Sequence, residues 1–176
     1  MHIKRSVCLA LLVLLTGACS QGSAQQRPQP ATVQVLEGEL EFGFELLRRV
    51  HSGEAPGENI FISPLSVAMA LGMAYNGAAG GTEAALRETL ALGDVTAAEM
   101  GAAYRRLVDR LLELDPAVEF LPANSIWYRE GLEVRAEFLE LNRSDYDAEV
   151  TALDFDSPEA APTINAWVKE KTKGLI

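Results

Sequence analysis

A run of apolar residues that reads as a helix without a polar face places the strongest constraint on the fold. In residues 65–75, large apolar side chains alternate with small ones, and Ser66 is the polar exception. Ser63 and Pro64 stand directly before this run, as a favoured N-cap residue followed by a favoured first helical residue. A helix that is apolar on all sides has to be buried, so we expect other elements to surround residues 65–75. We also expect the Ser66 hydroxyl to be buried and hydrogen-bonded.

Apolar residues at helical spacing predict further amphipathic helices before and after this one. The first ends at Gly53 and has its apolar face at Leu36, Leu40, Phe44, Leu47 and Val50. The later helices are predicted over residues 82–90 with Thr82 as cap, over 96–114 with a capping box of Thr96 and Glu99, over 134–141, and over 158–174 with Ser157 and Pro158 at its start. The helix over 96–114 is expected to bury Met100, Tyr104 and Leu107.

Short runs of β-forming residues predict strands over residues 59–62, 118–128 and 150–155. No hairpin turn joins any two of them. Because the backbone groups of a strand need partners, we expect these strands to find few partners within the chain. The sequence therefore predicts a mostly helical α+β fold, present as an incomplete domain whose next strand would follow Ile176.

The first residues have the pattern of a bacterial-type export signal. Lys4 and Arg5 precede an apolar run over residues 7–15, which is too short to span the roughly 30 Å hydrocarbon core of a bilayer. Residues 1–18 are predicted to be a signal peptide and residues 19–32 a flexible tether, which leaves residues 33–176 for the domain. We expect an exported protein, either extracellular or held at the cell envelope.

Two cleavage sites compete at the end of this signal. Small residues lead to Cys19 as in a lipoprotein processing site, although Thr16 stands where leucine is preferred. The alternative is ordinary signal-peptidase cleavage after a small residue such as Ala24. We favour lipidation of Cys19, because a free cysteine at this place has no other evident use, and lipidation would anchor the protein to a membrane.

Charge and residue counts argue against several kinds of function. The 15 Lys+Arg and 25 Asp+Glu give a formal charge of −10, which argues against a broad nucleic-acid footprint. The two histidines are His2 and His51, and no nucleophile-elbow motif accompanies them. Four aspartates lack the glycine and glutamate of a calcium loop: Asp145, Asp147, Asp154 and Asp156. We expect no enzyme activity, no metal site and no cofactor.

Several motifs resemble, in order and spacing, the N-terminal part of the serpin family. They lie at residues 42–47 (helix A), 59–71 (start of helix B), 80–90 (helix C), 123–128 (strand 2 of sheet A) and 164–176 (helix F and its exit). The resemblance runs from about residue 36 to the C-terminus. It implies a serpin-like fold with helices A–F and the first strands of sheet A. A serpin is well over twice as long, so we expect a fragment.

The resemblance also implies a function. In this family, a protease cleaves an exposed reactive-centre loop and is trapped when that loop inserts into sheet A as an extra strand. The implied partners are extracellular serine or cysteine proteases, with no role for nucleic acid. The chain lacks the reactive-centre loop and is expected to be inactive alone. The alternative is a non-inhibitory serpin-fold lipoprotein that acts as a binding or scaffold module at the cell surface.

By motif match, Ser63 and Ser66 resemble the shutter at the base of sheet A, where small hydroxylated residues form hydrogen bonds across the opening. The helix F motif supplies Asn165, Trp167, Thr172 and Gly174.

Two further groups of residues, two tryptophans and three arginines, are interpreted as structural. We expect Trp127 and Trp167 to pack in the core. We expect Arg105, Arg106 and Arg110 to form a solvated face with i,i+4 pairs to Asp109 and Glu113, although in some serpins the matching helix binds glycosaminoglycan.

Overall fold

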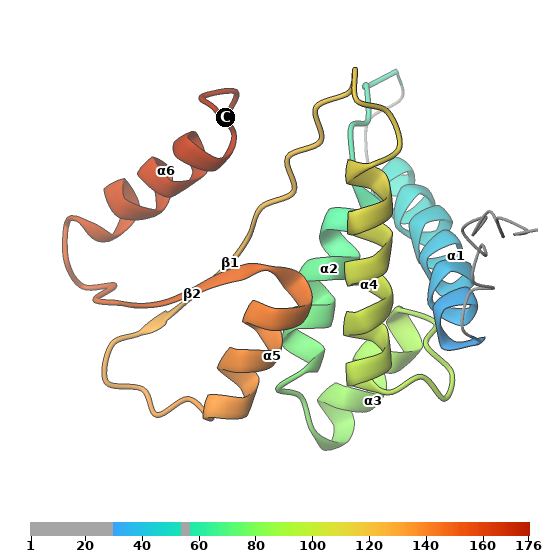
Figure 1. Cartoon of the computed structure of the whole chain (residues 1–176), viewed down its shortest axis with the longest axis horizontal. Helices are drawn as coiled ribbons and strands as arrows, with labels where there is room; N and C mark the ends of the chain where they lie inside the picture. The colour runs from blue at the N-terminus through green and yellow to red at the C-terminus, as the bar shows by residue number, and fades with distance from the viewer. Residues whose placement is uncertain (1–29, 54–56) are drawn as a thin grey trace, which may run out of the picture.

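The computed structural model describes residues 30–53 and 57–176 (Figure 1). In this part of the chain the elements follow in the order α1 (Pro30–Gly53), α2 (Pro64–Tyr75), α3 (Gly80–Thr89), α4 (Ala97–Leu112), β1 (Asn124–Arg129), α5 (Ala136–Tyr146), β2 (Ala148–Leu153) and α6 (Ala160–Lys171). None of the described helices has the length and apolar character needed to cross a membrane. The fold is α+β and mostly helical, as predicted.

The predicted signal peptide, residues 1–18, lies outside the described residues, as do Cys19 and Ala24. Of the predicted tether only residues 30–32 are described, and they form the first turn of α1. Thr32 is buried there, and its hydroxyl accepts a hydrogen bond of 2.5 Å from Arg106 of α4. These three residues therefore belong to the helical part of the molecule.

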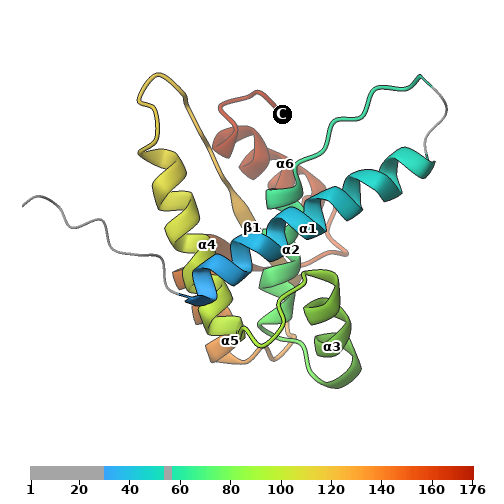
Figure 2. The same ribbon diagram turned by 90° about the vertical axis from the view of Figure 1, so that its right-hand side faces the viewer.

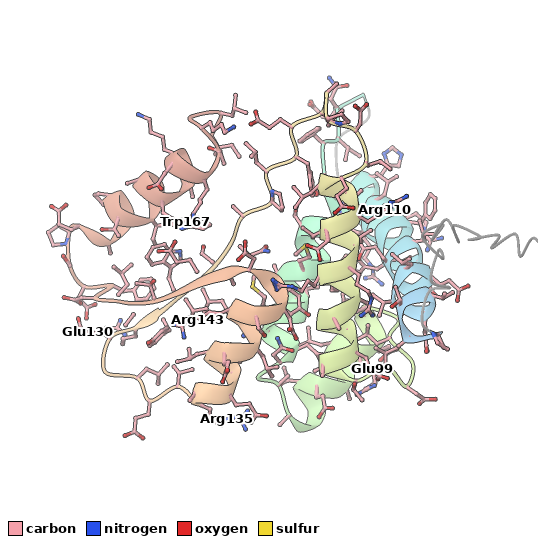
Figure 3. All side chains as sticks on the ribbon, in the orientation of Figure 1. Glu99, Arg110, Glu130, Arg135, Arg143 and Trp167 are labelled. Carbon is pink, nitrogen blue, oxygen red and sulfur yellow. The ribbon has the colours of Figure 1, made fainter. Side chains whose placement is uncertain are left out.

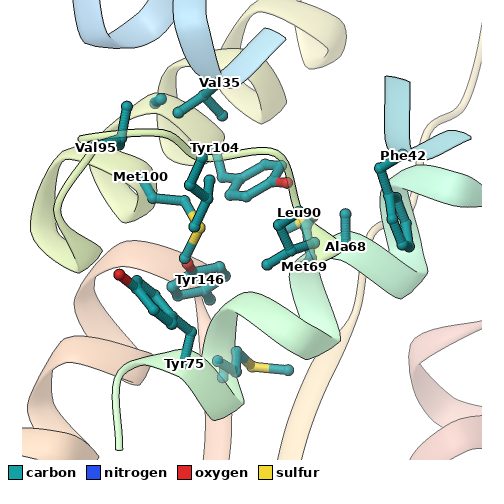
Figure 4. Packing of buried hydrophobic residues seen from close by; sticks show 14 of the residues in the cluster. Val35, Phe42, Ala68, Met69, Tyr75, Leu90, Val95, Met100, Tyr104 and Tyr146 are labelled. Carbon is teal, nitrogen blue, oxygen red and sulfur yellow. The ribbon is translucent and has the colours of Figure 1, made fainter. Parts of the chain in front are cut away.

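The core lies where α2 meets α1, α4 and α5 (Figures 2 and 4). Met69 and Met73 of α2 pack there with Met100 and Tyr104 of α4 and with Tyr146 at the end of α5. The Tyr104 and Tyr146 rings are tilted by 43° at a centroid distance of 6.0 Å. Met100 and Tyr104 lie on the buried face predicted for their helix, which confirms that part of the spacing argument.

The predicted apolar face of α1 is not the face that α1 buries. The buried residues are Thr32, Val35, Gly38 and Phe42. Leu40 and Phe44 remain 64% and 65% exposed. The reason is close packing at Gly38, where an added Cβ would lie 2.8 Å from the Leu90 carbonyl oxygen. A glycine lets the α3–α4 connection approach α1, which a leucine at the same place would prevent.

Helix α2 is covered on one side only, contrary to the prediction. Its buried residues are Ala68, Met69, Gly72, Met73 and Tyr75. On the other side Val67 is 38% exposed, and Ser66 is exposed rather than buried. Helices α1, α3, α4 and α5 pack against α2, and among the described residues they leave the side with Ser66 and Val67 accessible.

The two strands form a parallel pair with α5 as the crossover between them. The register runs from Asn124 opposite Ala148 to Arg129 opposite Leu153. Parallel strands need such a crossover, which explains why the sequence has no hairpin turn between them. Each strand is thereby paired along its whole length with the other one.

The predicted strands are partly wrong in extent. Residues 59–62 form no strand, and the Phe61 side chain is fully exposed. Residues 118–123 also lack a strand, so β1 begins at Asn124, and β2 ends at Leu153 instead of continuing to Phe155. The physical reason is that β-forming residues adopt a ladder only where a partner strand is present.

Helix starts follow the predicted capping only in part. The Thr96–Glu99 capping box is present, and the Ser63 side chain accepts from the Ser66 amide at the start of α2. Helix α3, however, begins at Gly80, and its N-cap is Ala79 rather than Thr82. At α6, a turn from the Ser157 carbonyl to the Ala160 amide comes first, and the N-cap is Glu159.

Candidate functional site

A groove beside α2 is lined by residues of two sequence motifs, one at the start of α2 and one at the end of α6. It has a volume of about 460 Å³ and lies between α2, residues 120–125 and residues 172–176. Ser63, Ser66 and Thr172 line it, together with Ser125 of β1. We call this the serine groove. Its two halves are more than one hundred residues apart in sequence, and the fold brings them together.

Ser63 and Ser66 form a hydrogen-bonded pair at the start of α2. Their hydroxyl oxygens are 2.8 Å apart, and the Ser66 amide donates to the Ser63 hydroxyl over 3.4 Å. The N-cap position of Ser63 explains the geometry, because an N-cap side chain faces the amides of the first helical turn. Both side chains are exposed, and their hydroxyls keep capacity for further hydrogen bonds.

Thr172 forms the opposite wall of the serine groove and ends α6. Its hydroxyl donates to the Val168 carbonyl over 2.8 Å and accepts from the Ile176 amide over 3.2 Å. Gly174 has φ +78°, in the left-handed region where glycine is favoured, and its amide donates to the Lys169 carbonyl. This turn brings Ile176 back to the groove.

Trp167 does not line the serine groove. It faces the strands (Figure 3), where it contacts Trp127 edge to face at a centroid distance of 6.2 Å, and its Nε1 donates to Glu149 over 2.6 Å. Both tryptophans are only partly buried, so they fasten α6 to the sheet from outside the main core rather than packing within it. Asn165 is exposed on α6, and its side chain makes no hydrogen bond to the described residues.

A buried polar pair in the core was missed by the sequence reasoning. Glu39 of α1 accepts a hydrogen bond of 2.8 Å from the Tyr104 hydroxyl of α4, and its second carboxyl oxygen is buried without a partner among the described residues. Burial raises the pKa of Glu39. Burial, with the Glu39 charge nearby, also raises the pKa of Tyr104. The available signal was spacing, since Glu39 falls between Val35 and Phe42 on one helix face.

Arg105, Arg106 and Arg110 of α4 are exposed, as the predicted solvated face requires, but the predicted ion pairs are not formed among the described residues. Arg106 donates to Thr32 of α1, and Arg105 donates to the Ser144 carbonyl of α5. Within residues 30–53 and 57–176, none of the ion pairs joins these side chains to Asp109 or Glu113. Carbonyl and hydroxyl acceptors on the neighbouring helices compete successfully with the carboxylates on the same helix.

His51 lies exposed in the last turn of α1. The described residues contain no group of three or more His, Cys, Asp or Glu side chains that could hold a metal ion. The polar side chains that line the serine groove carry hydroxyls (Ser63, Ser66, Ser125 and Thr172) or an amide (Asn124), and such groups can exchange hydrogen bonds with a backbone.

The fold and the sequence match one family of proteins, described as Serpin (serine protease inhibitor), over residues 37–176. The chain therefore belongs to the serpin family. Its members are in general inhibitors of serine proteases rather than catalysts, and binding proteins also occur among them. The recognition that the motifs gave is confirmed, and so is the fold class.

Individual relatives illustrate both kinds of protein. The chain is 31% identical to the bovine plasma serine protease inhibitor over 97% of its length, covering 44% of that protein. It is 36% identical to rabbit corticosteroid-binding globulin over 78% of its length, covering 36% of that protein. Among solved structures, human thyroxine-binding globulin matches 83% of the chain with a TM-score of 0.72 and 30% identity, and 40% of that structure is covered. The chain thus spans less than half the length of these relatives.

Proposed function

We propose that this chain is the N-terminal portion of an exported serpin that inhibits extracellular serine or cysteine proteases by inserting its reactive-centre loop into sheet A. The observation that carries the proposal is the serine groove. Ser63 and Ser66 from the start of α2 and Thr172 from the end of α6 meet there beside the first residues of β1. A fold that opens a sheet to admit a strand needs adaptable hydrogen-bond partners where the opening begins.

In this proposal the described residues belong to the part that moves. The Ser63–Ser66 pair would hold the closed state and would exchange its hydrogen bonds when the sheet opens. Helix α6, fastened by Trp167, would have to shift to admit the inserted strand. Residues 158–174 form a separate lobe over the strands in Figure 1, which is compatible with such a shift.

The test is incubation of the full-length protein with trypsin-like, elastase-like and papain-like proteases. We expect a covalent complex of protease and inhibitor that survives SDS. The Ser66→Ala variant should shift the outcome from complex toward cleaved, released protein, because it weakens control of sheet opening. Ser52→Ala is the matched control, since Ser52 is exposed near the end of α1, does not line the serine groove, and among the described residues its hydroxyl bonds only to the Arg49 carbonyl. Cleavage without any stable complex would contradict inhibition.

A second candidate is a non-inhibitory serpin-fold binding protein. The similarity to corticosteroid-binding globulin and to thyroxine-binding globulin favours considering it. It predicts no stable complex with any protease, together with saturable binding of a hydrophobic hormone-like ligand. Titration of the full-length protein with cortisol and with thyroxine, followed by tryptophan fluorescence, separates the two candidates.

We further propose that the protein is anchored to a membrane through lipidated Cys19. Metabolic labelling with a clickable fatty acid in the native host should label the wild type and not Cys19→Ala. The variant should then be released into the soluble fraction. If cleavage occurs after Ala24 instead, as the alternative predicts, neither protein should be labelled. Equal labelling of both proteins would show that Cys19 is not the lipidated residue.

A further inference from the structure

One ion pair joins the two walls of the serine groove. Glu119 directly precedes one wall, residues 120–125, and Lys173 follows Thr172 in the other wall, residues 172–176. The Lys173 ammonium group donates to the Glu119 carboxylate across 54 positions of sequence. Among the described residues, no other hydrogen bond or ion pair connects residues 119–125 with residues 172–176. The polar connection between the walls therefore depends on this pair.

The wall at residues 172–176 has little else to hold it in place. Leu175 and Ile176 are 83% and 81% exposed, so burial of apolar surface contributes little here. Its own hydrogen bonds stay within the end of α6, as in the bonds of Thr172 to Val168 and to Ile176. A weak contact with the opposite wall can then decide how often this turn opens, because local opening of a lightly packed segment requires little free energy.

Lys173 also has an unusual backbone conformation for a residue with a side chain. Its φ is +50°, in the left-handed region. The Gly174 amide donates to the Lys169 carbonyl and the Lys173 amide to the Glu170 carbonyl, which is the bond pattern of a Schellman helix end. Glycine is the usual residue at the left-handed position of this motif, because it has no Cβ. A lysine side chain with a function of its own explains why backbone strain is retained here.

We propose that the Glu119–Lys173 pair is an electrostatic strap that holds the two walls of the serine groove together, so that ionic strength regulates the opening of the groove. The two side chains are 61% and 59% exposed, and salt therefore screens their attraction. The strap itself does not depend on the function proposed above. Its consequence for protease inhibition does, because that consequence assumes that the serine groove takes part in the opening of sheet A.

A simpler role for Lys173 would be confined to its own helix. A lysine near a helix C-terminus interacts favourably with the helix dipole and with the free carbonyl groups of the last turn. That role would not involve Glu119, which lies outside α6. A change at Glu119 that alters the wall at residues 172–176 therefore distinguishes a strap from a helix cap.

Hydrogen exchange in the full-length protein provides this readout. The amides of residues 172–176 are all hydrogen-bonded, so their exchange reports the opening of this wall. At low salt, Glu119→Gln and Lys173→Gln should each speed this exchange roughly two- to fivefold, the range expected for the loss of an exposed ion pair. Lys173→Arg should exchange at the wild-type rate, because arginine keeps the positive charge.

Reversal of the charges tests the interaction directly. Glu119→Lys or Lys173→Glu alone places like charges opposite each other and should speed exchange further, whereas the two changes together should restore most of the protection. Lys171→Gln is the matched control and should change exchange little, because Lys171 is an exposed lysine in the last turn of α6 without an ion pair among the described residues. In about 1 M salt, where the screening length is about 3 Å, the wild type, Glu119→Gln and Lys173→Gln should exchange alike.

Two results would overturn the strap. One is unaltered exchange of residues 172–176 in Glu119→Gln at low salt, and the other is a doubly reversed protein that exchanges no more slowly than the single reversals. Thermal unfolding of each variant checks that it folds, and because both side chains are exposed, none of these changes removes a core contact.

Protease assays test the consequence for inhibition separately. Faster opening favours loop insertion over hydrolysis of the acyl-enzyme, so Glu119→Gln should raise the share of stable complex at low salt. An unchanged share alongside faster exchange would contradict this link and leave the strap in place. Faster exchange in a protein that forms no complex with any protease would contradict only the proposed inhibitory function.

Discussion

At the scale of single residues, Glu39 is a carboxyl group whose environment differs strongly from water. One carboxyl oxygen accepts from Tyr104, and the other is buried without a partner among the described residues. Desolvation disfavours the charged form of such a group, and this outweighs the single hydrogen bond from Tyr104. The neutral form of Glu39 is therefore better suited to the folded protein than the ionised form.

This environment predicts the direction of a pH dependence. The pKa of Glu39 is raised in the folded protein above its ordinary value of 4.5. Its contribution to stability is thus fully present below pH 4.5 and is lost as the pH rises through the raised folded value. The unfolding temperature of the wild type, compared with that of Glu39→Gln, should therefore fall as the pH rises from 4.5 through the raised pKa of the folded state. Thermal melts at a series of pH values measure the difference, with Glu37→Gln as an exposed control on the same helix. Parallel profiles for wild type and Glu39→Gln would contradict the assignment.

A second prediction concerns the contact between Gly72 and Tyr146. A Cβ at Gly72 would lie 2.6 Å from the Tyr146 hydroxyl oxygen and 3.1 Å from Cε of Met100. Gly72→Ala should therefore lower the free energy of unfolding by about 1–3 kcal/mol, the usual range for overpacking. The Tyr146 hydroxyl is buried without a partner among the described residues, so Tyr146→Phe should be nearly neutral by itself.

The double variant Gly72→Ala with Tyr146→Phe tests whether the clash with the Tyr146 hydroxyl causes this loss of stability. In the Tyr146→Phe background the 2.6 Å contact no longer exists, so Gly72→Ala should cost less than about 1 kcal/mol there. Denaturant unfolding of the four proteins measures the coupling. Gly81→Ala, where an added Cβ meets nothing within 4 Å, is the matched glycine control. Equal losses in both backgrounds would locate the strain elsewhere.

Sequence spacing predicted some of these residues and missed others for a physical reason. The buried face of α4 follows from the spacing of Met100 and Tyr104, because the partly buried Leu107 continues the same stripe. Helix α1 has two apolar stripes, and the more hydrophobic one, with Leu40 and Phe44, was predicted to be the buried one. The buried one depends on Gly38, whose role is close approach rather than hydrophobicity. Glu39 was missed because a carboxyl is normally solvated.

At the scale of elements, the sequence predicted helices better than strands. A helix satisfies its own backbone, so the apolar period and the capping residues locate it within a few residues. A strand depends on a partner elsewhere in the chain, and residues 59–62 and 118–123 have β-forming residues but no partner among the described residues. The serine groove was predictable only through the family resemblance, because spacing alone cannot bring residue 63 to residue 172.

The attachment of α6 gives a prediction at this scale. Its contacts with the sheet centre on Trp167, through the edge-to-face contact with Trp127 and the hydrogen bond to Glu149. An aromatic pair is worth about 0.5–1.5 kcal/mol and a net hydrogen bond about as much. Trp167→Ala should therefore speed amide exchange throughout α6 by roughly tenfold or more, while Glu149→Gln should have a smaller effect.

Mass spectrometry of hydrogen exchange in the full-length protein measures both effects. Lys169→Ala is the control, because Lys169 is an exposed residue of the same helix. Exchange in α4 and α5 should stay unchanged in all three variants, since the core does not include Trp167. If α6 exchanged at the wild-type rate in Trp167→Ala, the helix would have to be held by contacts other than this pair.

At the scale of the whole molecule, uncovered apolar faces decide how the 176-residue chain behaves by itself. Leu40, Phe44 and Leu47 line an apolar groove on α1 next to Ile62 and Pro64. The Phe61 side chain, in the connection between α1 and α2, is fully exposed. Contiguous exposed apolar surface of this kind favours association over a monomeric state. In the longer protein proposed above, further elements would cover these faces.

The chain produced alone should therefore self-associate at micromolar concentration and enhance the fluorescence of anilinonaphthalene sulfonate, whereas the full-length protein should do neither. Phe44→Ser together with Phe61→Ser should reduce both effects, because these changes remove two of the largest exposed apolar side chains and leave the core unaltered. Leu132→Ser is the control, since Leu132 is also exposed but lies in the β1–α5 loop, at the far side of the strand pair from α1. Sedimentation velocity measures the association directly. A monomer without dye binding would contradict this prediction, because Leu40, Phe44 and Phe61 would then not form an accessible apolar surface in the chain alone.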